Sequence, residues 1–169
     1  MRGPEFNGIV IDVGCMSYGA EESIITLIDR FNPRLLLGFD ANEELQPGVE
    51  TIDETVVIRI QAAAWFMDGP LPWRSGTLGA AVNFGDEETI SVRGVNLGYM
   101  LDMLPEGCVL KMDAEGAEYI LLPLFREMGL DRKLHLAWIE WHPPETANGF
   151  FNGEQTKLRC PMEVWDPHG

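Results

Sequence analysis

Three carboxylates stand within six residues in the stretch VLKMDAEGAEYILL, residues 109–122. They are Asp113, Glu115 and Glu118, and an apolar run lies on either side of them. Carboxylates can act as general acids or bases, or they can bind a divalent cation. In the first turn of a helix they are also stabilised without any ligand, by N-capping or by the helix dipole. We expect Asp113 to be the first candidate for contact with a ligand and Glu115 the second, while Glu118 supports the helix.

A second pair of polar residues, Glu140 and His142, lies at the end of the apolar run LHLAWIEW, residues 134–141. Glu140 is inside the run and His142 directly follows it. If this run and the run before Asp113 are neighbouring parallel strands, these side chains meet beyond the strand ends. His142 is then a candidate general base, because its ordinary pKa is close to neutral. Alternatively, Asp113, Glu140 and His142 bind Mg²⁺ or Mn²⁺, since oxygen and imidazole ligands suit such ions. A loop histidine with no role is an equal alternative to the base.

The stretch IDVGCMSYG, residues 11–19, ends an apolar run with Asp12 and continues into a glycine-containing turn. The positions of Gly14 and Gly19 do not give the Gly-x-Gly-x-x-Gly spacing of a dinucleotide site. They do not form a phosphate-binding loop either, because Gly19 is not followed by Lys and Ser or Thr. A strand-to-helix turn without a ligand remains the alternative.

Asp40 follows the next apolar run, residues 34–39, and lies 21 residues after Gly19. An acid at this place can accept hydrogen bonds from both ribose hydroxyls of an adenosine. The acidic first turn disfavours a pyrophosphate and favours a ligand with an ammonium and a sulfonium group, which indicates S-adenosylmethionine. The candidate cofactor-binding residues lie in the turns after the first three predicted strands: Asp12, Gly14, Cys15, Met16, Ser17, Gly19, Asp40, Ala41, Ala63 and Ala64.

The elements that position these residues follow from the hydrophobic pattern. Strands are expected at 8–13, 34–39, 55–60, 108–113 and 134–141, with an edge strand at 162–166, and helices at 21–31, 95–104 and 115–128. The last helix contains Pro123, where we expect a kink. Residues 68–88 are rich in Gly and Pro and predict a long loop with at most a short strand. Alternation of strands and helices predicts an α/β fold with a Rossmann-like, doubly wound, mostly parallel sheet.

The bulk composition narrows the class of protein. The 169 residues, 46% of them hydrophobic, predict one domain over 7–169, with 1–6 resembling a cloning remnant. A net charge of −15 argues against nucleic-acid and anionic-membrane partners. The chain has neither a signal-peptide pattern nor an apolar run of about 20 residues, so a cytoplasmic location is expected. Three widely spaced cysteines, Cys15, Cys108 and Cys160, indicate reduced thiols.

Over about residues 8–142 the order of motifs resembles the FkbM-type S-adenosylmethionine-dependent methyltransferases. The stretches that carry the resemblance are IDVG…G, LLLGFDAN, IRIQAAAWFMDG, VNLGYML, VLKMDAEGAE and WIEWH. The most specific is the family pattern Lys-[Ile/Met]-Asp-x-Glu-Gly-Ala-Glu after a hydrophobic run, matched at Lys111, Asp113, Glu115, Gly116, Ala117 and Glu118. The resemblance implies a methyltransferase-type Rossmann-like fold. It also implies methyl transfer, usually to a hydroxyl of a sugar or natural product.

The chain departs from the family pattern at four places, and the first is Gly98, where family members often carry an acid after the Leu that matches Leu97. Its first loop, GCMSYG, is one residue longer and lacks the usual Asn, and Asp40-Ala41 replaces the commoner Glu-Pro. It ends soon after Glu140, so an abbreviated final strand pair is expected. The first hypothesis is therefore an O-methyltransferase for a small hydroxylated acceptor. The others are a catalytically silent methyltransferase-like binding module and a nicotinamide oxidoreductase, which the loop spacing disfavours.

Overall fold

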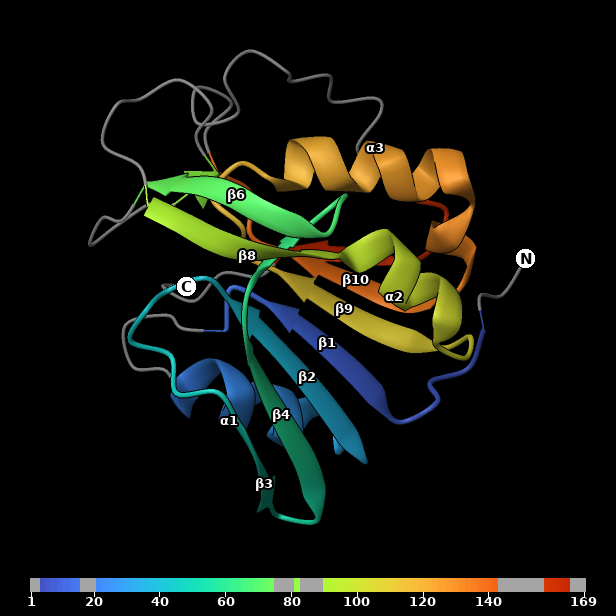
Figure 1. Ribbon diagram of the computed structural model, residues 1–169. Coiled ribbons are helices and arrows are strands. Elements are labelled where there is room, and N and C mark those ends of the chain that lie inside the picture. Colours follow the sequence, from blue (N-terminus) through green and yellow to red (C-terminus); the bar gives the residue numbers. More distant parts are fainter. Residues whose placement is uncertain (1–3, 16–20, 75–80, 83–89, 143–156, 165–169) are drawn as a thin grey trace.

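The computed structural model describes residues 4–15, 21–74, 81–82, 90–142 and 157–164, and these residues form two β-sheets and three α-helices (Figure 1). The larger sheet contains β1 (Ile9–Val13), β2 (Leu35–Asp40), β3 (Gly48–Ile52), β4 (Thr55–Gln61), β9 (Cys108–Met112), β10 (Leu134–Ile139) and β11 (Met162–Val164). The smaller sheet contains β5 (Ala63–Trp65), β6 (Gly69–Arg74), β7 (Ala81–Val82) and β8 (Ile90–Asn96). The helices are α1 (Glu21–Phe31), α2 (Leu97–Met103) and α3 (Glu118–Met128), and a short 3₁₀ helix, η1 (Leu130–Arg132), follows α3.

The larger sheet has the strand order β11-β10-β9-β1-β2-β4-β3. All neighbouring strands in it run parallel except β3, which forms an antiparallel hairpin with β4. Numbered along the chain, the six parallel strands lie in the order 3-2-1-4-5-6, which is that of Rossmann-type doubly wound sheets. The order reverses between β1 and β9. A ligand crevice is therefore expected beyond the carboxyl ends of these two strands.

The helices cover both faces of this sheet (Figure 1). On one face, the apolar stripe of α1 packs against Val10 of β1 and Val109 of β9. On the other, α2 and α3 pack against Ile11 of β1 and Leu110 of β9. Because successive residues of a strand point to opposite faces, a central strand between two helical layers is mostly apolar, and the buried Asp12 and Lys111 are the charged residues of β1 and β9. This explains why the predicted strands in these regions were readable as continuous apolar runs.

Most of the predicted elements are confirmed, with boundaries within a few residues. The α/β class and the mostly parallel, doubly wound sheet are present, and β11 lies at the sheet edge as expected. Within 68–88 the structure describes the six-residue β6 and the two-residue β7, so the short strand is present and a second one accompanies it. The rest of that range lies outside the described residues. Pro123 lies inside α3, and the kink there stays a prediction.

The sequence did not predict β3, β5 or β8. β3 is an exposed hairpin strand with little apolar pattern, and the three residues of β5 are too few to show a period. β8 pairs with β5 and β6, which are distant from it in the sequence. The smaller sheet lies on the same side of the larger one as α2 and α3 (Figure 1). None of the described helices is long and apolar enough to cross a membrane.

Candidate functional site

The predicted site residues that follow β9 and β10 lie side by side at the carboxyl edge of the larger sheet. Asp113 directly follows β9 and Glu140 directly follows β10. Their backbone amides continue the sheet ladder, with the Asp113 N–H donating to the carbonyl of Val13 and the Glu140 N–H to that of Met112, both at 2.9 Å. The adjacency predicted from the two strand ends is therefore confirmed.

Gly14 brings the turn after β1 into direct contact with the turn after β9. Its φ is +75°, which is the left-handed region that favours glycine. A Cβ placed on Gly14 would lie 1.9 Å from the carbonyl oxygen of Asp113. No side chain is tolerated at this point, so the two turns pack backbone to backbone at the reversal of strand order.

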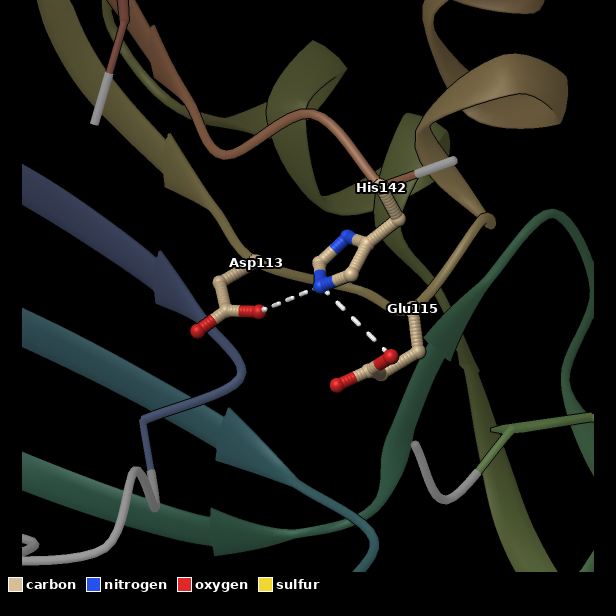
Figure 2. A group of neighbouring side chains, drawn as sticks. All are labelled: Asp113, Glu115 and His142. Carbon is tan, nitrogen blue, oxygen red and sulfur yellow. Dashed lines mark ion pairs between the residues drawn. The ribbon is translucent and has the colours of Figure 1, made fainter. Parts of the chain in front are cut away.

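His142 lies among three carboxylates, those of Glu118, Asp113 and Glu115, and Figure 2 shows the last two. Its Nε2 atom is 3.5 Å from Oδ1 of Asp113 and 3.5 Å from Oε2 of Glu115, and its Nδ1 atom is 3.2 Å from Oε1 of Glu118. The side chains of Asp113 and His142 are largely buried, while that of Glu115 is 32% exposed. The open side of the cluster is thus at Glu115.

Glu118 has a larger role than the sequence suggested. Its side chain is fully buried. Oε2 accepts a hydrogen bond from the Gly116 N–H at 2.9 Å, and Oε1 accepts one from the backbone N–H of His142 at 3.1 Å. The hydroxyl of Tyr119 donates to the carbonyl of His142 at 2.5 Å. Together these contacts fix both the backbone and the ring of His142 against the start of α3.

The helix α3 begins at Glu118, three residues later than predicted. Glu115 and Gly116 have φ values of +48° and +96°, which interrupt a right-handed helix. The prediction that Glu115 lies in a first helical turn was therefore wrong. It lies in a turn before the helix, and this turn directs its carboxylate toward His142 (Figure 2).

The protonation of His142 bears on its predicted role as a base. Burial alone would lower its pKa, but hydrogen bonds that the ring donates to the carboxylates of Glu115 and Glu118 outweigh burial and raise the pKa to about 10. Without a bound cation the ring is an imidazolium at neutral pH, and an imidazolium cannot accept a proton. The geometry thus disfavours His142 as a general base.

Glu140 lies next to Asp113, but its carboxylate is not among the atoms gathered around Nε2 of His142. The donor atoms that lie within 4.8 Å of one another belong to Asp113, Glu115 and His142. For the predicted cation site, the structure therefore puts Glu115 in the place of Glu140. Burial and the charge of Asp113 raise the pKa of Glu140, and burial likewise raises the pKa of Asp113. Oε2 of Glu140 is buried without a hydrogen-bond partner among the described residues.

Asp12 was predicted to contact a cofactor, and the structure places it beneath the site instead. It is fully buried: Oδ2 accepts a hydrogen bond from the Ser23 hydroxyl at 2.9 Å, and Oδ1 lies 3.1 Å from Nζ of Lys111. Lys111 is equally buried and donates to the carbonyl of Gly14 at 2.8 Å. Its Nζ atom is also 3.7 Å from Asp113. The ion pair therefore connects β1 with β9, and Lys111 also contacts the turns that follow these two strands.

The other candidate cofactor residues fall into two groups. Asp40 ends β2 on the far side of β1 from β9, is half-buried, and its Oδ1 accepts a hydrogen bond from the Asn42 N–H at 2.8 Å. The small side chains among the candidates are buried: Cys15 and Ala41 in the turns after β1 and β2, and Ala63 and Ala64 in β5. Met16, Ser17 and Gly19 lie outside the described residues.

Comparison with protein-family models, with curated proteins and with solved structures found no match for this chain. The methyltransferase resemblance therefore rests on the quoted residues alone.

Proposed function

We propose that this chain is an S-adenosylmethionine-dependent methyltransferase that methylates a hydroxyl of a small acceptor, such as a sugar, a glycoconjugate or a natural product. The observation that carries the proposal is the charge at the carboxyl edge of the sheet. Six carboxylates lie in or beside the turns there, belonging to Asp12, Asp40, Asp113, Glu115, Glu118 and Glu140. The described cationic groups that pair with them are Lys111 and His142.

The negative charge at this edge distinguishes between S-adenosylmethionine and a dinucleotide, two ligands that sheets with this strand order can bind. The strand order alone is equally that of dinucleotide-binding proteins. A pyrophosphate would enter a region with an excess of negative charge, whereas a sulfonium and an ammonium group would be attracted to it. The edge therefore favours S-adenosylmethionine over a nicotinamide dinucleotide.

Asp40 and Gly14 are the described residues that suit the cofactor. The Asn42 amide fixes one carboxylate oxygen of Asp40 at the end of β2, where an acid can accept hydrogen bonds from ribose hydroxyls. Gly14 follows β1, the strand next to β2, and its close packing against the Asp113 carbonyl brings the turns after β1 and β9 together at the reversal of strand order. S-adenosylmethionine, when bound, supplies an activated methyl group with a good leaving group.

The residues beyond β9 and β10 suit the acceptor. An alcohol must lose its proton as it becomes methylated, so the site needs a group that can hold this proton. Glu140 fits this role, because its buried Oε2 has no hydrogen-bond partner in the described part of the chain and its pKa is raised by burial and by Asp113. Alignment of donor and acceptor in a site that excludes water would supply much of the remaining catalysis.

The proposal is tested by the affinity for S-adenosylhomocysteine of the wild type, Asp40→Ala and the control Glu44→Ala. Glu44 is an exposed acid four residues further along the chain. Loss of hydrogen bonds to a charged group weakens binding of the Asp40 variant by about tenfold or more, while the control binds like wild type. Equal affinities in the two variants would remove Asp40 from the cofactor site. A wild type that binds no S-adenosylhomocysteine would contradict the function itself.

A further inference from the structure

We propose that Asp113, Glu115 and His142 bind one divalent cation of the Mn²⁺ or Mg²⁺ type, and that Glu118 is the positioning residue that orients His142 toward it. The site goes beyond the proposed methyl transfer, because cation binding can occur and can be measured without cofactor or acceptor. Its ligands come from the turn between β9 and α3 and from the segment after β10 (Figure 2).

The three ligand atoms lie within 4.8 Å of one another, close enough for one cation to draw them together. Oxygen and imidazole ligands bind such ions at about 2.1 Å, so neighbouring ligands in octahedral or tetrahedral geometry lie roughly 3.0–3.5 Å apart. Nε2 of His142 is 3.5 Å from the nearest carboxylate oxygen of Asp113 and of Glu115. Binding would therefore require only small side-chain movements.

The orientation of His142 also fits a metal ligand. A histidine that binds a metal usually donates its other ring N–H to a carboxylate, which fixes the tautomer and the ring plane. Nδ1 of His142 has such a partner in Glu118, whose two oxygens are held by backbone amides. With the proton on Nδ1, the lone pair of Nε2 points at Asp113 and Glu115.

A polar atom beside the cluster lacks a hydrogen-bond partner. Oε2 of Glu140, beside Asp113, is buried and has no hydrogen-bond partner among the described residues. A buried oxygen of this kind normally has a protein or water partner. A water molecule bound to the cation would supply that partner, since three protein ligands leave coordination positions open to water.

The charges in this region support the same conclusion. Three carboxylates, from Asp113, Glu115 and Glu118, surround His142. A fourth, from Glu140, lies near Asp113, and the nearby Lys111 is shared with Asp12. A cation with two charges would offset this excess. The imidazole ligand favours Mn²⁺ over Mg²⁺, because Mg²⁺ prefers oxygen ligands alone.

The test is a titration of Mn²⁺ into the protein alone, with bound ion followed by loss of the electron paramagnetic resonance signal of aqueous Mn²⁺. We expect one strong site per chain in the wild type. Glu115→Gln removes a partly exposed ligand and preserves the side-chain shape, and it should weaken binding at least tenfold. Glu118→Gln leaves the three ligands in place but disturbs the orientation of His142 and the contact with the Gly116 N–H, and it should weaken binding by about 10- to 100-fold. Glu127→Gln, an exposed acid on α3, is the matched control and should bind like wild type.

A second measurement does not depend on any variant. Paramagnetic Mn²⁺ should broaden the ring resonances of His142 at ion concentrations that leave those of His135 sharp, since His135 contacts the carbonyl of Pro4 and not this cluster. Broadening of both rings alike, or a wild type that binds no Mn²⁺ at millimolar concentration, would overturn the proposal. So would equal Mn²⁺ affinities for Glu115→Gln and Glu127→Gln. None of these outcomes depends on whether S-adenosylmethionine binds.

Discussion

Nζ of Lys111 lies 3.1 Å from Oδ1 of Asp12, and both side chains are fully buried on neighbouring central strands. The two residues are direct cross-strand partners in the register of β1 and β9. Charges removed from water are tolerated only when they are paired, so each residue makes the other acceptable. Because Lys111 also contacts Gly14 and Asp113, the pair stabilises the turns after β1 and β9.

Removal of one partner should therefore be costly. We expect Lys111→Met to lower the free energy of unfolding by about 3–5 kcal/mol, because it leaves the Asp12 carboxylate buried and unpaired. The double variant Asp12→Asn/Lys111→Met, which carries no buried charge at this position, should recover much of that loss. Urea denaturation of the two single variants and the double variant gives the coupling energy. Strictly additive losses would show that the two charges do not stabilise each other.

Gly14 should be intolerant of even the smallest side chain. Gly14→Ala combines a left-handed φ with a Cβ 1.9 Å from the Asp113 carbonyl, so the two turns must separate. We expect a loss of more than about 2 kcal/mol in the free energy of unfolding. Gly48→Ala is the control, because a Cβ there meets no atom within 4 Å and the change should stay within about 0.5 kcal/mol. Similar stabilities for the two variants would mean that the turns are not in contact.

The three cysteines should react slowly in the folded protein. Burial raises the pKa of Cys160 to about 12, and it raises the pKa values of Cys15 and Cys108 as well. The thiolate is the reactive form, so at about pH 8 an aromatic disulfide reagent should modify the native protein at least tenfold more slowly than the denatured chain. Fast modification of all three thiols in the native protein would contradict their burial.

The same pKa shifts predict how stability depends on pH. Because the thiols ionise more easily in the unfolded chain, their contribution to stability is fully present below pH 9. That contribution should fall as the pH rises from 9 toward 12. Denaturation midpoints measured between pH 7 and pH 10.5 test this. Cys160→Ala should show a weaker decline than wild type, and an identical decline would show that this thiol does not titrate in that range.

The sequence predicted the frame of the fold well because its central strands are buried on both faces. Runs such as CVLKMD can hardly be mistaken for another element, and the polar residues that follow them mark the carboxyl edge of a parallel sheet. The meeting of Asp113, Glu140 and His142 could be inferred on this basis alone. The smaller sheet could not, because β5, β6 and β8 gain their partners only from pairings between distant segments.

Two features of the site could not be predicted from the local sequence pattern. Periodicity placed Glu115 in a helix, but the positive φ values of Glu115 and Gly116 delay the helix and turn this carboxylate toward His142. The glycine was the only signal of such a turn. Asp12 looked like a cofactor ligand because its partner, Lys111, lies 99 positions away and becomes its neighbour only through the strand order.

The measurement that tests the central proposal most directly is calorimetric titration of the wild-type chain with S-adenosylhomocysteine and, separately, with NAD. The acidic carboxyl edge and Asp40 predict that S-adenosylhomocysteine binds with one-to-one stoichiometry and at least about tenfold more tightly than NAD. If S-adenosylhomocysteine does not bind at high micromolar concentration, or if NAD binds more tightly, the methyltransferase proposal is contradicted.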